Sequence, residues 1–528
     1  MRRGDARVMQ SARAGVLAGL FLVLATAPAA MAQKKKDKKP ATATPPQQPI
    51  GRPMSLADVL QFAVQHSPAL ATAKINVEIA QARVLEATGI EDWLFGLTGS
   101  ALRTKNRDSG EDGFITVRSD TWTARGSLSK LFFTGGRFSI AGETRTTDST
   151  QLFRVTDEAT MNSIVTNFDS FEVLSSVTAR LDQPLLRGFG ETVTRADQSR
   201  ARIARDAAKL NRQAVARTEV RDLVGAYWLV AFAAADLEIR RASVDLANER
   251  RRLTEASVKG GATAPTELNA VDQVIAQREE EVVAAELALL ERSLELRRRA
   301  GIEVGPGEIE IAATSVLEVE PRPVDLDQVL ATSIEASPEI AVLRTREKGA
   351  KLEIAVTENG LLPRLDLSVY GGPLGRDNEF AGSVKRMGEF KDYQVGAELS
   401  FDFPLGNNAA QGASHRAHAE SRQVMVDMAD VRTQVASSAV QAVALSRSAE
   451  KRLELSRRAI ELSEKNIKAE IGRFELGKST NFDVLLRQDE LKQARLRYAL
   501  AVTDYLRARA AIGALTGEVL AEYGITVK

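Results

Sequence analysis

The segment FELGKSTNFDVLLRQDEL, residues 474–491, decides the fold, because it interrupts a long helical sequence at a glycine and resumes it within a few residues. An earlier segment, VKGGATAPTELNAVDQVI at 258–275, does the same. In both segments an acidic residue follows the glycine by six positions. The sequence therefore predicts two helical hairpins that turn in the same way.

Local signals at both turns support this prediction. Gly477 and Gly261 tolerate the positive φ that ends a helix. Thr480 is placed to cap the next helix, with Asp483 three residues later as the acid of a capping box. Glu267 occupies the matching position in the first hairpin.

The helices that lead into these turns are expected to be very long. No proline lies between Pro184 and Pro265, and none follows Pro404. Helices that fill most of these intervals would measure on the order of 100 Å at 1.5 Å per residue. Apolar and small residues recur at alternating steps of four and three from Val424 to Ala449, which predicts coiled-coil packing.

The hairpins belong to two copies of one plan. Residues 54–85 align with 324–355, and Ser67-Pro68 matches Ser337-Pro338. Each copy begins with an amphipathic helix, breaks at Ser-Pro and continues as a second helix. Alternating strand patterns follow, ending in Q-P-L in the first copy and F-P-L in the second.

Composition excludes several classes of function. The 528 residues contain 71 Lys+Arg and 70 Asp+Glu, so no basic excess indicates a nucleic-acid partner. The chain has no cysteine, which excludes disulfides and thiolate metal sites. His415 and His418 have no further ligand nearby in the sequence, and no catalytic motif has a convincing context, so we expect no metal, no cofactor and no enzyme.

The N-terminus predicts export. Arginines precede the apolar run VLAGLFLVLATA at 16–27, and small residues follow at Ala30 and Ala32. This pattern predicts a signal peptide over 1–32, with an uncleaved membrane anchor as the alternative. Lysines and prolines over 33–53 predict a disordered linker.

Short strands between very long helices leave a small sheet with open edges, which several chains would have to pool into one closed barrel. The order and duplication of these features resemble the TolC family of outer-membrane efflux channels. The resemblance is carried by L-x-x-V/A-L…S-P at each repeat start, LLPRLDLS at 361–368, the strand ends, and F-x-x-G-x-x-T-x-x-D-V-L at 474–485. It implies a mainly α fold with a small β part: a trimeric α-barrel of coiled-coil helices continuous with a shared transmembrane β-barrel.

On this plan the first repeat spans 54–304, with strands at about 93–187 and a long hairpin at 190–300. The second repeat spans 323–517, with strands at about 362–405 and a hairpin at 409–515, and a C-terminal tail covers 518–528.

The resemblance implies a passive homotrimeric conduit through the outer membrane of a Gram-negative-type bacterium, with a long periplasmic extension. It would form part of a tripartite efflux or type I secretion system, in contact with outer-membrane lipid, a periplasmic adaptor and an inner-membrane pump. The sequence indicates neither the transported substrate nor the particular pump. The alternative is an exported periplasmic coiled-coil scaffold without a pore.

The resemblance also places a gate at the hairpin tips. An acid at Asp483 would line the constricted tunnel end, whereas its local alternative is an acid that only favours the helix dipole. The other constriction candidates are Leu486, Glu267, Thr266 and Phe474. The candidates for adaptor contact are Gly260, Gly261, Gly477, Lys478 and Ser479.

Three of these positions depart from the family pattern. Leu486 stands where related gates often carry a second acid, Ser479 replaces an arginine, and Phe474 replaces a tyrosine and has no hydroxyl to donate.

The first repeat has a longer strand region than the second. Its additional residues include SLSKLFFTGGRFSIAGE at 127–143, which predicts a hairpin around Gly135-Gly136. Such a hairpin extends the barrel or projects from it. Aromatic residues in this region are candidates for an interfacial girdle, with ordinary sheet packing as the alternative: Trp93, Phe95, Trp122, Phe132 and Phe133.

Overall fold

The computed structural model describes residues 54–107, 113–157, 162–261, 264–305, 311–315 and 317–525. The predicted signal peptide and linker lie outside the described residues, as do the last three residues of the chain. The described chain divides into two compact units. The first is formed by residues 83–201 and 350–420 and contains the sheet, and the second, formed by the other described residues, contains the hairpins.

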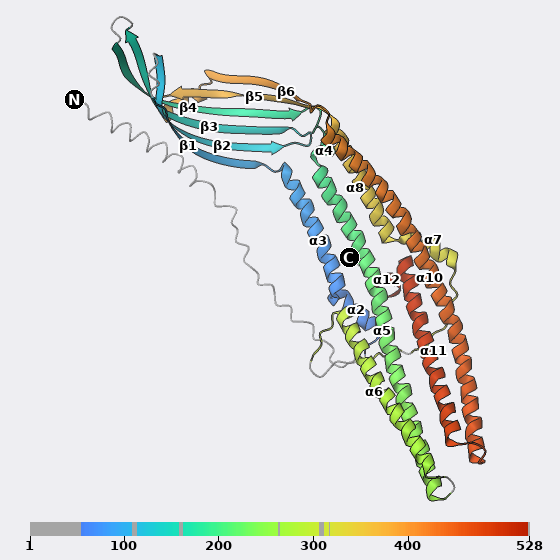
Figure 1. Cartoon of the computed structure of the whole chain (residues 1–528). Helices are drawn as coiled ribbons and strands as arrows, with labels where there is room; N and C mark the ends of the chain where they lie inside the picture. Colours follow the sequence, from blue (N-terminus) through green and yellow to red (C-terminus); the bar gives the residue numbers. More distant parts are fainter. Residues whose placement is uncertain are drawn as a thin grey trace. The chain divides into compact units, whose positions relative to one another are not determined.

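The first repeat supplies two helices, four strands and a long hairpin (Figure 1). Its main elements are α2 (Leu56–His66), α3 (Pro68–Thr88), β1 (Leu94–Lys105), β2 (Gly113–Leu131), β3 (Arg137–Asp157), β4 (Asn162–Pro184), α5 (Ala196–Lys259) and α6 (Thr266–Ala300). A 3-10 turn (Gly89–Glu91) precedes β1, and the short helix α4 (Glu191–Thr194) precedes α5.

The second repeat follows the same order with two strands in place of four. Its elements are α7 (Leu326–Ala336), α8 (Pro338–Leu361), β5 (Arg364–Asp377), α9 (Phe380–Gly388), β6 (Asp392–Asp402), α10 (Asn408–Glu475) and α11 (Asn481–Thr516), and α12 (Val519–Glu522) follows. The helix α9 was not predicted from the sequence. It packs on β4 and β5, where the Ser383 hydroxyl lies 2.8 Å from that of Ser175.

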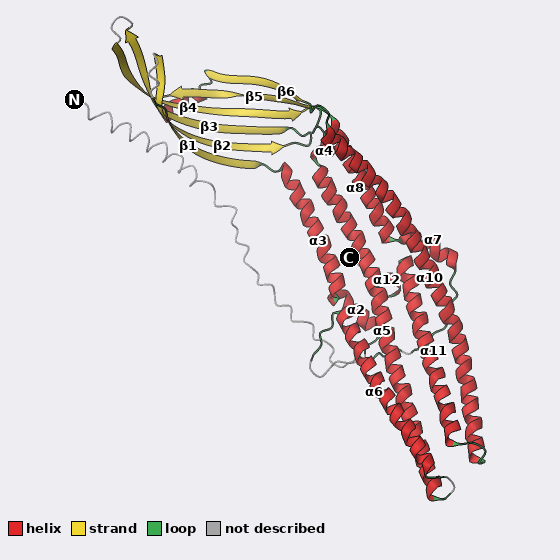
Figure 2. Ribbon diagram, in the orientation of Figure 1, coloured by secondary structure: helices red, strands yellow, loops and turns green. Residues whose placement is uncertain are grey.

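The strands of both repeats form one antiparallel sheet in the order β1-β2-β3-β4-β5-β6 (Figure 2). The predicted hairpin at 127–143 is confirmed: β2 pairs with β3 up to Leu131 and Arg137, and Gly135 turns the chain with φ of 88°. Strands β4 and β5 pair along Val173–Pro184, so the sheet joins the two repeats.

The Ser-Pro breaks separate paired helices as predicted. Ser55 begins α2 with a capping box to Asp58. The Ser67 amide still donates to the Ala63 carbonyl at 2.8 Å, and α3 begins at Pro68, which needs no amide partner. The same break recurs in the second repeat, where Ser337 is the C-cap of α7 and α8 begins at Pro338.

The second unit has its largest core where α2 packs against α5 and α6. Tyr227 and Leu223 of α5, Leu60 of α2 and Leu296 of α6 are at most 2% exposed there. The Tyr227 hydroxyl donates to the Met54 carbonyl at 3.1 Å, so the buried ring has a partner for its polar group.

The long helices α5 and α10 contain 64 and 68 residues, or about 100 Å each at 1.5 Å per residue. The prediction of a mainly helical fold with a smaller β part is confirmed. Within the described part of the chain, no helix is both apolar enough and long enough to cross a membrane.

Candidate functional site: the tips of the two helical hairpins

The tip of the second hairpin closes with a Schellman motif. Gly477 has φ of 68°, its amide donates to the Phe474 carbonyl at 2.9 Å, and the Lys478 amide donates to the Arg473 carbonyl at 2.9 Å. These two bonds satisfy carbonyls that the end of α10 leaves without a helical partner. The predicted positive φ of Gly477 at the end of the helix is therefore confirmed.

The first hairpin turns in the same way. Gly261 has φ of 74°, and its amide donates to the Val258 carbonyl at 3.0 Å. Residues 262 and 263 lie outside the described part, and α6 begins at Thr266. Thr266 is exposed and Glu267 is half-buried in the first turn of α6.

The capping box predicted for the second tip is confirmed. The Asp483 amide donates to the Thr480 hydroxyl oxygen at 3.2 Å, and the Thr480 amide donates to Asp483 Oδ2 at 3.1 Å. The Thr480 hydroxyl also contacts that oxygen, at 2.7 Å. These hydrogen bonds from Thr480 hold the pKa of Asp483 below its usual value, so the carboxylate is charged at neutral pH.

Ser479 connects this cap to an acid that the sequence analysis missed. Its hydroxyl lies 2.6 Å from Glu470 Oε1 and 3.4 Å from Asp483 Oδ2. Glu470 is only 8% exposed, with the guanidinium nitrogens of Arg473 and Arg487 at 3.7 and 4.0 Å. Nothing in the sequence distinguished Glu470 from the other acids of α10, because its burial depends on how the chain turns.

Phe474 contacts the other hairpin through the face of its ring. The guanidinium carbon of Arg250, on α5, lies 4.6 Å from the ring centroid. Arg250 is 6% exposed, and burial lowers its pKa. A cation held over an aromatic ring gains most when it is desolvated. Phe474 therefore links the hairpins without the hydroxyl whose absence the sequence analysis noted.

Polar groups continue this contact between the hairpins. Arg278 of α6 is 4% exposed and donates to the Ser243 carbonyl of α5 at 2.7 Å and to Gln488 of α11 at 3.5 Å. Lys492 of α11 is 5% exposed, and its ammonium lies 2.9 Å from Glu281 of α6. Buried charges need such partners, so these bonds fix how α11 sits on the first hairpin.

The remaining candidates lie apart from these contacts. Leu486 is 44% exposed, and Gly260, Gly477 and Lys478 are exposed at the turns. The structure brings Ser479 and Asp483 together through hydrogen bonds and brings Phe474 to the first hairpin. The assignment of these residues to a constriction or to adaptor contact remains a prediction.

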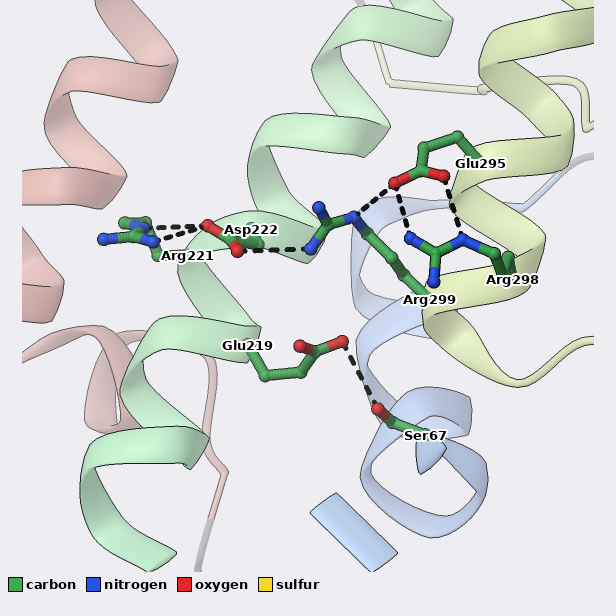
Figure 3. Close-up of polar contacts among 7 residues, drawn as sticks. All are labelled: Ser67, Glu219, Arg221, Asp222, Glu295, Arg298 and Arg299. Atoms are coloured by element: carbon green, nitrogen blue, oxygen red, sulfur yellow. Dashed lines mark hydrogen bonds and ion pairs between the residues drawn. The ribbon is translucent and has the colours of Figure 1, made fainter. Parts of the chain in front are cut away.

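A second polar cluster lies where α5, α6 and the break between α2 and α3 meet (Figure 3). Arg299 contacts Asp222 at 3.1 Å and Glu295 at 2.8 Å, so it ties α6 to α5. The Ser67 hydroxyl donates to Glu219 at 3.3 Å. Burial raises the pKa of Glu219, and the positive charge of Arg299 only partly opposes this.

Among the described residues, no group of three or more His, Asp or Glu side chains is placed to hold a metal ion. His418 is exposed, and its Nε2 lies 3.5 Å from Glu358 Oε1.

We expect Gly477→Ala to destabilise the second tip by about 1 kcal/mol, because an L side chain is strained at this positive φ. Hydrogen exchange across 470–485 would report the loss as faster local opening. Gly260→Ala is the matched control, since Gly260 is an exposed tip glycine that does not have a positive φ. Equal protection in both variants would contradict the role assigned to Gly477.

We expect Glu219→Gln to raise the thermal unfolding midpoint increasingly between pH 4.5 and pH 7. The pKa of Glu219 is raised from 4.5 in the folded chain, so the folded state binds this proton more tightly, and stability is lost as the pH rises through the folded pKa. The variant keeps an acceptor for Ser67 but does not ionise.

Glu295→Gln is the control, because we expect it to lower the thermal unfolding midpoint at neutral pH. Arg298 and Arg299 lower the pKa of Glu295 to about 2, so its carboxylate stabilises the fold at neutral pH and this contribution is lost only as the pH falls toward that value. If the thermal unfolding midpoint of Glu219→Gln equals that of the parent at every pH, burial does not raise the pKa of Glu219.

Residues 329–518 match the family model described as outer membrane efflux protein. No curated protein matches the chain.

Solved structures are similar over most of the chain. The outer membrane protein VceC from Vibrio cholerae covers 88% of this chain and 96% of its own, with 17% identity and a TM-score of 0.62. The CmeC outer membrane channel from Campylobacter jejuni covers 88% and 85%, with 12% identity and a TM-score of 0.62. The open state of the MtrE outer membrane channel from Neisseria gonorrhoeae covers 88% and 89%, with 14% identity and a TM-score of 0.59.

The chain therefore has the fold of outer-membrane channels, and over residues 329–518 it matches the outer membrane efflux protein family, which confirms the resemblance to the TolC family predicted from its sequence.

Proposed function

We propose that this chain is one of three identical subunits of an outer-membrane channel that serves a tripartite efflux or type I secretion system. The channel is a passive conduit, because an inner-membrane pump supplies the energy. The family match supports an efflux channel rather than an enzyme. The observation that carries the proposal is the division of the sheet into one apolar and one polar face.

The apolar face follows from the strand register. Successive residues of a strand point to opposite faces, so paired residues identify which side chains share a face. Phe95, Leu128 and Ile140 are paired in a row across β1, β2 and β3, and Leu181 is paired with Val369 across β4 and β5. Apolar residues on this face that are more than a third exposed include Phe95, Leu97, Trp122, Leu128, Ile140, Leu181, Val369, Tyr393, Val395, Leu399 and Phe401.

Charged groups bound this apolar face at its two ends. At the end near the helices, the ammonium of Lys130 lies 5.4 Å from the centroid of the Trp93 ring. At the opposite end, the next pair on this face after Trp122 and Ala101 is Asp120 with Arg103, whose side chains form an ion pair at 2.6 Å. An apolar band with aromatic residues near its limits is what lipid contact requires.

The opposite face is mainly polar, with Leu94 and Leu102 of β1 as exposed apolar exceptions. Arg125 is paired with Glu143 across β2 and β3, and the Arg180 guanidinium contacts Asp182 at 2.8 Å on β4. These arginines and Glu143 line a shallow cavity of about 180 Å³ together with Tyr370. Exposed ion pairs of this kind suit a water-filled lumen.

The edges of the sheet support a shared barrel. Within the described residues, β1 is hydrogen-bonded only to β2 and β6 only to β5. Unpaired strand edges are not tolerated in lipid, whereas pairing β1 of one copy with β6 of the next leaves none. A scaffold without a pore would leave both these edges and the apolar face exposed to water.

In this arrangement the hairpin tips face the periplasm, where they meet the adaptor protein and form the gate. Three charged Asp483 carboxylates form an anionic ring at the tunnel end, which repels other anions and holds cations. Exposed Leu486 adds an apolar ring one helical turn further along α11.

The gate is tested by Asp483→Asn in planar bilayers. Since asparagine keeps an acceptor for Thr480, the cap is preserved while the charge is lost. We expect purified protein to form conducting channels, and the variant to lose block by divalent cations and to change its single-channel conductance. Glu475→Gln, which removes an exposed charge at the end of α10, is the control. If the variant conducts and is blocked like the parent, Asp483 has no gate role.

A further inference from the structure

The first repeat carries two strands more than its duplicated plan requires. In the second repeat, β5 leaves the helix α8, and β6 leads into the helix α10. In the first repeat, β1 and β4 have these same places, beside α3 and α5. Strands β2 and β3, of 19 and 21 residues, are inserted between them.

The inserted strands lie within the sheet. Strand β2 pairs with β1 from Leu94 to Lys105, and β3 pairs with β4 from Arg137 to Asp157. The insertion therefore separates β1 from β4, which would otherwise be neighbours as β5 and β6 are. A hairpin that projected from the sheet would leave β1 and β4 paired with each other.

The insertion has the same two faces as the rest of the sheet. Leu128 and Ile140 form a pair on the apolar face and are 36% and 39% exposed. Ser129 and Ser139 form the adjacent pair on the polar face, with Arg125 and Glu143 further along. A hairpin surrounded by water on both sides would gain nothing from exposing apolar residues on one side only.

The turn of the insertion is fastened to the base of the sheet. The Gly190 amide donates to the Thr134 carbonyl at 3.1 Å, and the Thr134 hydroxyl donates to Gln183 at 3.0 Å. Gly135 packs so closely that a Cβ there would lie 2.3 Å from the Gly188 carbonyl oxygen. The hairpin is thus held where β4 ends and α4 begins.

An aromatic contact adds to this attachment. The Arg195 guanidinium lies 5.8 Å from the Phe133 ring centroid and also contacts Glu91 at 2.5 Å. Glu91 precedes β1 and Arg195 follows α4, so the turn rests on a contact between the segments that flank the four strands.

We propose that the β2–β3 hairpin is part of the pore wall, so that three copies close a barrel of 18 strands instead of the 12 that four strands per copy would give. The inference rests on the proposed trimeric channel. Because barrel diameter grows roughly in proportion to strand number, the barrel is about half as wide again. Barrels of about 16 to 18 strands leave an aqueous channel, so passage is limited at the hairpin tips and not in the sheet.

Single cysteines in the full-length protein test this inference, since the chain has no native cysteine. Ser129→Cys and Ser139→Cys place a thiol on the polar face, and Leu128→Cys and Ile140→Cys place one on the apolar face. Protein in lipid vesicles is treated with a charged, water-soluble thiol reagent, which needs a hydrated thiolate. A nitroxide label at the same positions reports contact with oxygen dissolved in the bilayer.

We expect the thiol reagent to modify cysteines at positions 129 and 139 but not at 128 and 140. Nitroxide labels should contact dissolved oxygen only at positions 128 and 140. Ser400→Cys and Leu399→Cys on β6 are matched controls outside the insertion. If Ser400→Cys is modified and Leu399→Cys is not, but all four hairpin positions are modified, the hairpin projects into water and the inference is wrong. If both control cysteines on β6 are also modified, the sheet is not in a membrane and the proposed channel is wrong as well.

Discussion

Backbone hydrogen bonding at the two edges of the sheet is the constraint on which the rest of this molecule depends. Six strands satisfy one another internally, but β1 and β6 each have one bonded neighbour among the described residues. An open, one-sided apolar sheet is unstable as a monomer in water and impossible in lipid. In the proposed channel, pairing with further copies would satisfy both edges and would close the apolar face into the outside of a barrel.

The hairpin tips carry a different chemistry from the sheet. Their helices end and begin through backbone bonds around Gly477 and Thr480, which are local and robust. The contacts between hairpins instead use buried cations, among them Arg250 over Phe474 and Lys492 beside Glu281. Buried charges add little net stability and are costly when their partners are lost. If the hairpins separated, water would hydrate these charges and offset part of the cost of breaking the contacts, which is compatible with the gate proposed at the tips.

The sequence predicts what is decided locally and leaves open what depends on packing. The glycine turns, the Thr480–Asp483 cap and the Ser67-Pro68 break were readable because each depends on neighbouring residues. Burial of Glu470 and the Arg250 contact were not, since they join residues that only the folded hairpins bring together.

The sheet shows the same division. A hairpin at 127–143 was predictable from Gly135-Gly136, but its small serine, glycine and alanine residues hid the alternation of its faces. Only the register, which places Leu128 beside Ile140 and both on the apolar side, shows that the hairpin has the same two faces as the rest of the sheet.

The most direct test of the proposed channel is electron microscopy of the mature protein extracted from outer membranes in detergent. A trimeric channel would appear as a three-fold particle with a hollow helical tail of roughly 100 Å. A water-soluble particle without a lumen or three-fold symmetry would contradict it.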